Sequence, residues 1–431
     1  MRIAIIGGGP SGALCALMLC RMARERALNI EVHVFERKIF TEFSPRGCNM
    51  CAGVISTSVV SNLKRLNLEV APTVIQRTIE GYCLTTNFGR VCLKKSPTAT
   101  IYTAYRGLGP PHSHFSEDAS FDNWLLREAS KVGAHCYNEL VTDVIPPWSN
   151  GNGERKPFVL MLQGGKRMEA DVVIGAFGTN SPLLRKIEAM GFGYRPPKTI
   201  HACQAELPLD EDAITKCFGD HIHVFAIGHP KALFGVLIPK RHHVTATLVG
   251  RWIKRADLEQ FLEHPRVREL FPRNWRLPPR YCHCHPHVAV TPARNPVADR
   301  FIIIGDACIS RYLKNGIDSA MFTAMRAADA VLDGRLTKGE LIKYYVRPCW
   351  RKYALDNLCG KALVNFYRIA FDMTWFVRAY LRLLELEQSI PDKNKRTLSR
   401  ILWEMFTGDT SYIHILRDCL KLRLPMDLFQ L

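Results

Sequence analysis

Long apolar runs are missing from this 431-residue chain, and no stretch approaches the roughly 20 residues that a membrane-spanning helix needs. We see no targeting segment either, because a strand-like pattern already begins at Arg2 and leaves no room for a signal or transit peptide. The fifteen cysteines therefore indicate a reducing cytosol, in which most of them are buried thiols. We expect a cytoplasmic protein that is soluble or peripheral on a membrane surface.

Acidic residues are scarce relative to basic ones. The sequence has 40 Asp and Glu against 58 Lys and Arg, a formal net charge of +18. A protein with such an excess of positive charge is suited to bind nucleic acid, an anionic membrane surface or an acidic substrate. No RNA-binding signature and no basic tail is present, so we expect no nucleic-acid partner.

The first thirty-six residues follow the pattern of a dinucleotide-binding unit. Arg2 to Ile6 is a short, nearly unbroken apolar run, which is typical of a strand buried in a parallel sheet. Gly7-Gly8-Gly9-Pro10-Ser11-Gly12 follows at once and fits G-x-G-x-x-G, and Ala13 to Ala23 predicts a buried helix. A second strand, Ile30 to Phe35, leads to Glu36. This order of strand, glycines, helix, strand and acid predicts a bound dinucleotide rather than a glycine turn without a ligand.

Each of these residues has a distinct physical role in the prediction. Gly7 permits a tight turn, Gly9 lets a pyrophosphate approach the backbone, and Gly12 lets the helix pack closely on the strand. The helix N-terminus offers N–H groups and partial positive charge to the phosphates. Glu36 can accept hydrogen bonds from a ribose hydroxyl.

A second informative stretch lies between residues 300 and 332. Phe301 to Ile304 predicts another fully buried strand, which ends on Gly305-Asp306-Ala307. Asn315-Gly316-Ile317 then precedes a predicted Ala-rich helix, Asp318 to Leu332. We expect Asp306 to accept a hydrogen bond from a sugar or ribityl hydroxyl, and the backbone near Gly316 to meet an anion or a ring carbonyl. The structural alternative is an Asp that only caps the helix.

The cysteine and histidine patterns give weaker signals. Cys48 and Cys51 form a C-x-x-C pair, which is a redox pair, half of a zinc site or a coincidence. The segment Cys282 to His287 suits a strand better than a zinc knuckle, so we predict no metal. His221 and His223 share one strand face, and without a third ligand we expect that face to point to solvent.

The remaining chain changes character along its length. Residues 186–290 look mostly β, whereas residues from about 336 onward are helical. Apolar residues with a helical period between Leu363 and Leu384 predict either a helix packed on the domain or an interfacial helix that docks on lipid. The aromatic residues that favour the second alternative are Phe366, Tyr367, Phe371, Trp375 and Phe376.

Three motifs in this order resemble those of the glutathione-reductase-type flavoproteins with the p-hydroxybenzoate hydroxylase fold. The glycine motif with Glu36 is similar to their site for the ADP end of FAD, and Ile304 to Ala307 is similar to their second FAD motif. Asp171 to Ser181 resembles the middle "DG" motif. Within this group the geranylgeranyl reductase family is most similar, because Cys51-Ala52-Gly53 and Phe234 to Lys240 resemble two of its segments.

The sequence also departs from that family's pattern. Phe177 replaces the Asp of the middle motif, and Val236 replaces the Trp of the Phe234–Lys240 motif. Asp118 stands where a flavin-contacting Arg is expected, before the helix start at Ser120-Phe121-Asp122, and Arg106 is the candidate to substitute for it.

The resemblance implies an FAD-dependent oxidoreductase that reduces isoprenoid double bonds of a lipid by hydride transfer from reduced flavin. Its expected partners are a prenylated lipid or another apolar small molecule and an electron donor, which is NAD(P)H, ferredoxin or another reductase. Two other functions of this fold stay open: a flavin-dependent monooxygenase, and a FAD-containing escort protein for prenyl lipids. The W-x-W-x-I-P motif of the halogenase branch is absent.

The resemblance also implies an α/β architecture with a Rossmann-like FAD-binding domain of discontinuous segments, an inserted β-rich substrate domain and a helical C-terminal region. The expected segments are 1–75, 116–185 and 291–335 for FAD, 76–115 and 186–290 for substrate, and 336–431 for the helical region. We predict Cys51 and Cys48 as residues that affect catalysis. The predicted cofactor-binding residues are Gly7, Gly8, Gly9, Ser11, Gly12, Glu36, Arg37, Ala52, Arg106, Val141, Gly305, Asp306, Gly316 and Ile317.

Overall fold

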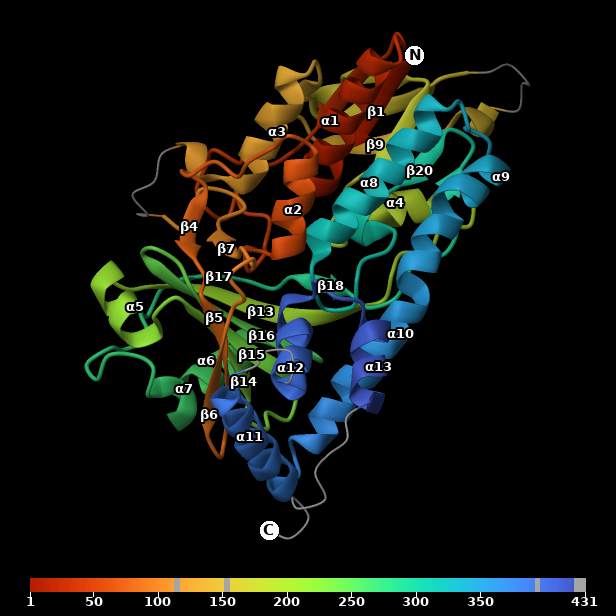
Figure 1. Cartoon of the computed structure of the whole chain (residues 1–431). Helices are drawn as coiled ribbons and strands as arrows, with labels where there is room; N and C mark the ends of the chain where they lie inside the picture. The colour runs from red at the N-terminus through yellow and green to blue at the C-terminus, as the bar shows by residue number, and fades with distance from the viewer. Residues whose placement is uncertain (112–116, 151–155, 392–395, 422–431) are drawn as a thin grey trace. The chain divides into compact units, whose positions relative to one another are not determined.

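The computed structural model describes residues 1–111, 117–150, 156–391 and 396–421. It divides the chain into two compact units (Figure 1). The first unit comprises Met1–Cys51, Tyr105–Thr199 and His287–Ala354, and the second comprises Ala52–Ala104, Ile200–Pro286 and Leu355–Leu431. The division near Cys51 comes earlier than the expected segment end at residue 75, because strand β3 (Val54–Ile55) pairs with β7 (Tyr102–Ala104). The expected boundary at 115/116 lies outside the described residues.

The first unit is built on a six-stranded sheet. Its strands lie in the order β19-β20-β12-β1-β2-β8, and all neighbours are parallel except β19 and β20. The strands are β1 (Arg2–Ile6), β2 (Glu31–Phe35), β8 (His135–Tyr137), β12 (Val172–Gly175), β19 (Val297–Ala298) and β20 (Phe301–Ile303). Four residues of β1, from Ile3 to Ile6, are buried, as expected for a strand covered on both faces.

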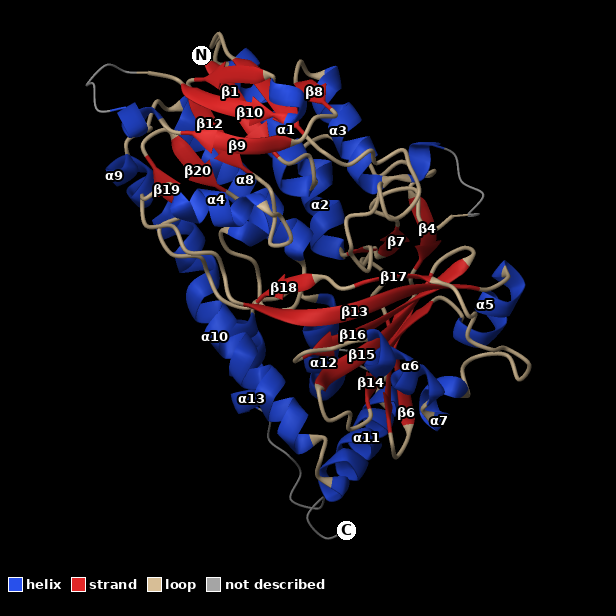
Figure 2. Cartoon of the chain, turned by 180° about the vertical axis from the view of Figure 1, so that it is seen from behind, coloured by secondary structure: helices blue, strands red, loops and turns tan. Residues whose placement is uncertain are grey.

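Helices cover one face of this sheet. Helix α1 (Pro10–Glu25) packs beside α8 (Gly316–Leu332) and α3 (Phe121–Lys131), while α4 (Leu183–Ala189) follows β12. A three-stranded antiparallel meander, β9 (Val141–Ile145), β10 (Phe158–Leu162) and β11 (Arg167–Ala170), lies over the other face (Figures 1 and 2). The predicted strand-glycine-helix-strand order is confirmed, and so is the mixed α/β fold class.

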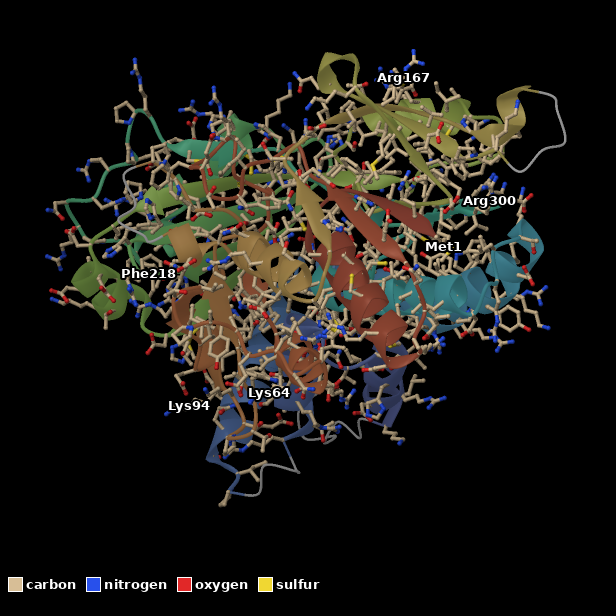
Figure 3. All side chains as sticks on the ribbon, turned by 90° about the horizontal axis from the view of Figure 1, so that it is seen from above. Met1, Lys64, Lys94, Arg167, Phe218 and Arg300 are labelled. Atoms are coloured by element: carbon tan, nitrogen blue, oxygen red, sulfur yellow. A yellow bond between two sulfur atoms is a disulfide. The ribbon has the colours of Figure 1, made fainter. Side chains whose placement is uncertain are left out.

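The second unit contains a larger, mostly antiparallel sheet in the order β17-β13-β16-β15-β14-β5-β6 (Figure 2). Its strands are β5 (Gly81–Thr86), β6 (Arg90–Lys94), β13 (Thr199–Pro208), β14 (His221–Ala226), β15 (Ala232–Pro239), β16 (His243–Gly250) and β17 (Cys282–Cys284). Figure 3 labels Lys94, the last residue of β6, and Phe218, the last residue of helix α5. Strands β5 and β6 are antiparallel neighbours and form a hairpin.

Helices pack on both faces of this larger sheet. Apolar side chains of α5 (Glu211–Phe218), α6 (Arg255–Glu263) and α7 (Pro265–Arg268) share a core with one face. On the other face, α11 (Thr374–Ser389) and α12 (Thr397–Thr407) cover β5 and β6. The remaining elements of this unit include β4 (Ile75–Thr78) and α2 (Thr57–Arg65).

The expectation about one strand face is wrong. The strand face that carries His221 and His223 does not point to solvent: His223 is buried, its ring lies edge-on to Phe218, and its Nε2 is 3.0 Å from the Phe218 carbonyl oxygen. Cys83 and Cys92, which lie opposite each other in the β5–β6 ladder, form a disulfide, and the other thirteen cysteines are free, in line with the expectation that most are thiols.

The C-terminal region is helical, as predicted. Helices α9 (Lys338–Leu341) and α10 (Arg347–Ala370) follow each other with a short π-helical turn between them, and α13 (Tyr412–Lys421) is the last described helix. Among the described helices, none is long and apolar enough to cross a membrane.

Candidate functional site

The glycine motif brings the first strand, the first helix and the middle motif into close contact. Gly7 has φ +108°, and a Cβ there would lie 2.5 Å from the carbonyl oxygen of Ala176. A Cβ at Gly12 would lie 1.8 Å from the carbonyl oxygen of Gly7. Larger residues are therefore excluded at both positions by backbone atoms, which agrees with the predicted turn and packing roles.

Gly9 faces polar side chains. It is the N-cap residue of α1, and a Cβ there would lie 3.1 Å from the Asn49 side-chain nitrogen and 3.8 Å from Nη2 of Arg106. The glycine therefore keeps open a space between the start of α1 and two hydrogen-bond donors. Because the first turn of a helix leaves backbone N–H groups unpaired, this space offers donors on several sides.

Glu36 is held at the end of β2 by backbone donors. Its carboxylate accepts hydrogen bonds from the N–H of Gly8 at 2.7 Å and from the N–H of Lys38 at 2.8 Å. A carboxylate accepts more than two hydrogen bonds, so capacity for a ribose hydroxyl is left. The adjacent Arg37 is exposed.

Asp306 follows the strand β20, beside the N-terminus of α8. Its Oδ1 atom is buried and has no hydrogen-bond partner within the described part of the chain. A Cβ on Gly316 would lie 3.6 Å from this Oδ1, so the carboxylate faces the first residue of the helix. Burial raises the pKa of Asp306, while the Ser310 hydroxyl and the charge of Arg106 act in the opposite direction.

The unmatched oxygen of Asp306 provides a test of whether FAD fits. A buried acceptor without a donor is unfavourable, and a hydroxyl group of the ribityl chain supplies the donor that is missing. The glycine at 316 leaves room beside the carboxylate. The residues present therefore fit FAD.

A network of polar side chains lies beside the space at Gly9. Asp122 is fully buried and forms a two-point ion pair with Arg106, whose Nη2 lies 3.0 Å from Asp122 Oδ2. Asp122 also accepts a hydrogen bond from Asn49 at 2.5 Å, and Asn49 accepts one from Lys38 Nζ at 2.6 Å. We call Lys38, Asn49, Asp122 and Arg106 the Arg106 network.

The charges of the Arg106 network favour an anion. The members of the network, two cations and one carboxylate, sum to a net positive charge, and the neighbouring carboxylate of Glu36 also acts on Lys38. Burial acts to lower the pKa of Arg106, but Asp122 and Cys51 raise it, so the guanidinium stays charged. Burial lowers the pKa of Lys38. The network thus presents positive charge where the glycine motif predicts a pyrophosphate.

The two cysteines of the C-x-x-C pair lie near different cations. Cys51 interacts with Arg106, whereas Cys48 lies near Lys38. Cys48 also accepts a hydrogen bond from the N–H of Met50 at 3.2 Å. Both are free thiols, and no cluster of metal-binding residues occurs within the described ranges.

The other predicted residues lie in varied places. Gly305 has φ +65°, and a Cβ there would collide with Ser11. Ile317 is buried in α8, and Val141 is buried in β9. Ala52 belongs to the second unit, where it packs against an apolar cluster that includes Tyr82.

Sequence reasoning missed two members of the Arg106 network, Asn49 and Lys38. Asn49 lies between the two cysteines, and no motif marks it. In the sequence, Asp122 marks only the start of a helix. An acidic residue in the first turn of a helix beside a predicted cofactor site could have indicated a partner for Arg106. Asp118, by contrast, forms an exposed ion pair with Arg127.

The chain has relatives among known proteins. No family model matches the chain. Among curated proteins, geranylgeranyl diphosphate reductase from Nicotiana tabacum is 24% identical over 393 residues, which covers 85% of this chain and 75% of that protein. The geranylgeranyl diphosphate reductase of Synechocystis is 23% identical over 387 residues, covering 85% and 86%.

Solved structures show the same fold. A geranylgeranyl bacteriochlorophyll reductase-like protein from Thermoplasma acidophilum superposes with a TM-score of 0.65 at 17% identity, covering 97% of this chain and 96% of that one. A flavin-dependent brominase gives 0.64 at 16%, covering 98% and 99%. The p-nitrophenol 4-monooxygenase of Pseudomonas putida gives 0.59 at 15%, covering 97% and 96%.

The fold, the site and these likenesses define the class: this is an FAD-dependent oxidoreductase. The predicted family resemblance is confirmed as well, since the chain is similar to geranylgeranyl reductase-like proteins over most of its length.

Proposed function

We propose that the protein reduces carbon–carbon double bonds of an isoprenoid lipid. The observation that carries this proposal is the sequence similarity to geranylgeranyl diphosphate reductases along 85% of the chain. When bound and reduced, FAD supplies a hydride to one alkene carbon, and a proton completes the second carbon. The electron donor in this proposal is NAD(P)H, ferredoxin or another reductase.

The chain's own residues bind and orient the cofactor in this account. Asp306 accepts a hydroxyl of the ribityl chain, the N-terminus of α1 and the Arg106 network hold the pyrophosphate, and Glu36 accepts a ribose hydroxyl. Cys51, in contact with Arg106, is the residue that we expect to affect turnover without removing the cofactor.

One face of the sheet in the second unit carries apolar and aromatic side chains, which suit an apolar substrate. Tyr82 of β5 packs against Trp403 and Phe406 of α12, with ring centroids 5.4 and 5.6 Å apart. Phe234 and Val236 of the strand that resembles the family's substrate motif lie in the same cluster. In this proposal a prenyl chain displaces part of that packing.

A buried ion pair follows the strand β15, which contributes Phe234 and Val236 to this apolar cluster. Lys240, directly after β15, is fully buried and pairs with Glu206 at 2.9 Å, and Glu206 also accepts a hydrogen bond from Thr245 at 2.8 Å. A buried pair of this kind holds the end of the strand in one position, and so positions the residues that precede it.

Product analysis tests the proposal. The flavin of the purified protein is reduced with dithionite under anaerobic conditions and mixed with geranylgeranyl diphosphate in detergent. We expect products that have gained two hydrogens per reduced double bond, detected by mass spectrometry. Absence of any such product together with oxygen-dependent addition of an oxygen atom to an apolar substrate would favour the second candidate, a monooxygenase, which the fold of the p-nitrophenol monooxygenase supports.

A further inference from the structure

Helix α10 and the first turn of α11 carry a row of exposed apolar side chains. Large apolar residues are normally covered, yet Leu358 and Trp375 are each 65% exposed and Phe366 is 55% exposed. The residues Leu355, Leu358, Phe366, Ile369, Met373 and Trp375 define this apolar stripe. The four members on α10 are separated by three, eight and three residues, and such spacing keeps them on one side of a helix.

The opposite side of α10 is packed, so the stripe is a true outer face. The side chain of Asp356 is buried and accepts a hydrogen bond from the N–H of Ile413 at 3.0 Å. A Cβ at Gly360 would lie 2.5 Å from the ring of Tyr412 in α13. Leu363 is buried on the same side.

The exposed aromatic rings of the apolar stripe rest on a fixed inner layer. Phe366 packs edge-on against Phe376, with centroids 6.0 Å apart, and Trp375 does the same at 5.9 Å. Phe376 in turn stacks on Tyr380, which belongs to the buried core between α11 and the sheet. The structure thereby separates the predicted aromatic set: Phe366 and Trp375 are outside, while the others line the core. Rings held in this way lose little conformational freedom on binding.

Basic side chains accompany the stripe. Lys361, Arg368, Arg378 and Arg382 are exposed on α10 and α11, and none of them forms an ion pair with a described residue. Only two acids on the same stretch, Asp372 and Glu385, are exposed. An apolar stripe bordered by exposed positive charge matches an anionic lipid surface, where apolar groups enter the interface and cations meet headgroups.

The dimensions agree with a helix that lies along a membrane. Fourteen residues separate Leu355 from Ile369, which at about 1.5 Å per residue gives a contact roughly 21 Å long. Charged residues alternate with the apolar ones, as they do in interfacial helices.

We propose that the apolar stripe docks this protein on the surface of an anionic lipid bilayer. The inference deepens the proposed function, because a lipid-borne substrate is reached from such a surface. Docking itself requires no turnover, so it is measured without substrate.

Flotation of the flavin-loaded full chain with vesicles tests the proposal. We expect binding to vesicles of phosphatidylcholine with about one third phosphatidylglycerol, weaker binding to phosphatidylcholine alone, and loss of affinity as salt is raised. The double variant Phe366→Ser/Trp375→Ser is expected to bind about tenfold or more weakly, and the variant Arg368→Gln/Arg382→Gln to lose its preference for the anionic lipid. All variants should keep their flavin.

The matched control is Trp252→Ser. Trp252 is 73% exposed in the same unit but lies outside α10 and α11, so its loss should leave vesicle binding unchanged. Equal losses in Trp252→Ser and in the double variant would overturn the proposal. Absence of vesicle binding by the parent protein would also overturn it. So would a parent dimer that the double variant converts to a monomer without any change in vesicle binding. Because the vesicles contain no isoprenoid substrate, these results are independent of whether the protein is a reductase.

Discussion

Replacing Asp122 by Ala is the most direct perturbation of the Arg106 network. The Asp122 carboxylate is fully buried and is the counter-charge of Arg106, as well as the acceptor for Asn49. Without it, a buried guanidinium has lost its ionic partner, which destabilises a protein by about 3–5 kcal/mol. In a unit of this size, each kcal/mol lowers the Tm by about 2–4 °C, so we expect a decrease of roughly 6–20 °C.

Differential scanning calorimetry of the flavin-free protein measures this decrease. The matched control is Asp118→Ala, four residues earlier, which removes an exposed ion pair with Arg127 and should destabilise the protein by no more than about 1 kcal/mol. The Asp122 variant should also retain less FAD, since Arg106 is no longer held beside Gly9. If both variants lowered the Tm equally, the idea that Asp122 compensates a buried charge would be refuted.

Three further predictions concern the site and the second unit. Asp306→Ala should remain folded by circular dichroism but lose most of its FAD, and normal flavin content in that variant would contradict the site assignment. Gly9→Ala should fold but bind FAD weakly, because the new Cβ enters the space beside Asn49. Gly12→Ala should fail to fold, because its Cβ would overlap the backbone oxygen of Gly7. The yield of folded protein and its flavin absorbance distinguish these two outcomes. Burial and nearby positive charge lower the pKa of His243 from 6.5 to about 4, so the stability that neutral His243 provides above pH 6.5 is lost as the pH falls toward 4, by up to roughly 3 kcal/mol. The Tm of His243→Gln should therefore decrease less than that of the parent between pH 7 and pH 5, and equal decreases would show that His243 does not carry this pH dependence.

Local patterns predicted the elements that position the site. The strand Arg2–Ile6 was predicted residue for residue, because a short apolar run followed by glycines has few alternatives. The hairpin β5–β6 is also visible in the local pattern, because short alternating runs flank the turn residues Asn87-Phe88-Gly89. The helix after Asn315 was predicted within two residues of its observed start at Gly316.

Long-range contacts were outside the reach of sequence patterns. The Arg106 network joins four segments that are far apart in the sequence, and no periodicity links them. Its members are Lys38 after β2, Asn49 between the two cysteines, Arg106 after β7 and Asp122 in α3. The burial of His223 was missed because its strand is covered by Phe218 from a neighbouring helix. Within one aromatic set, only tertiary packing decided that Phe376 lies inside and Trp375 outside.

The central claim is that the reduced flavin of this protein passes its electrons to an isoprenoid double bond. Stopped-flow absorbance tests it most directly: dithionite-reduced protein is mixed anaerobically with a geranylgeranylated lipid, and separately with air-saturated buffer. The account predicts that the lipid reoxidises the flavin in the absence of oxygen. Rapid reoxidation by air through a C4a-adduct absorbance, with none by the lipid, would contradict it and identify a monooxygenase.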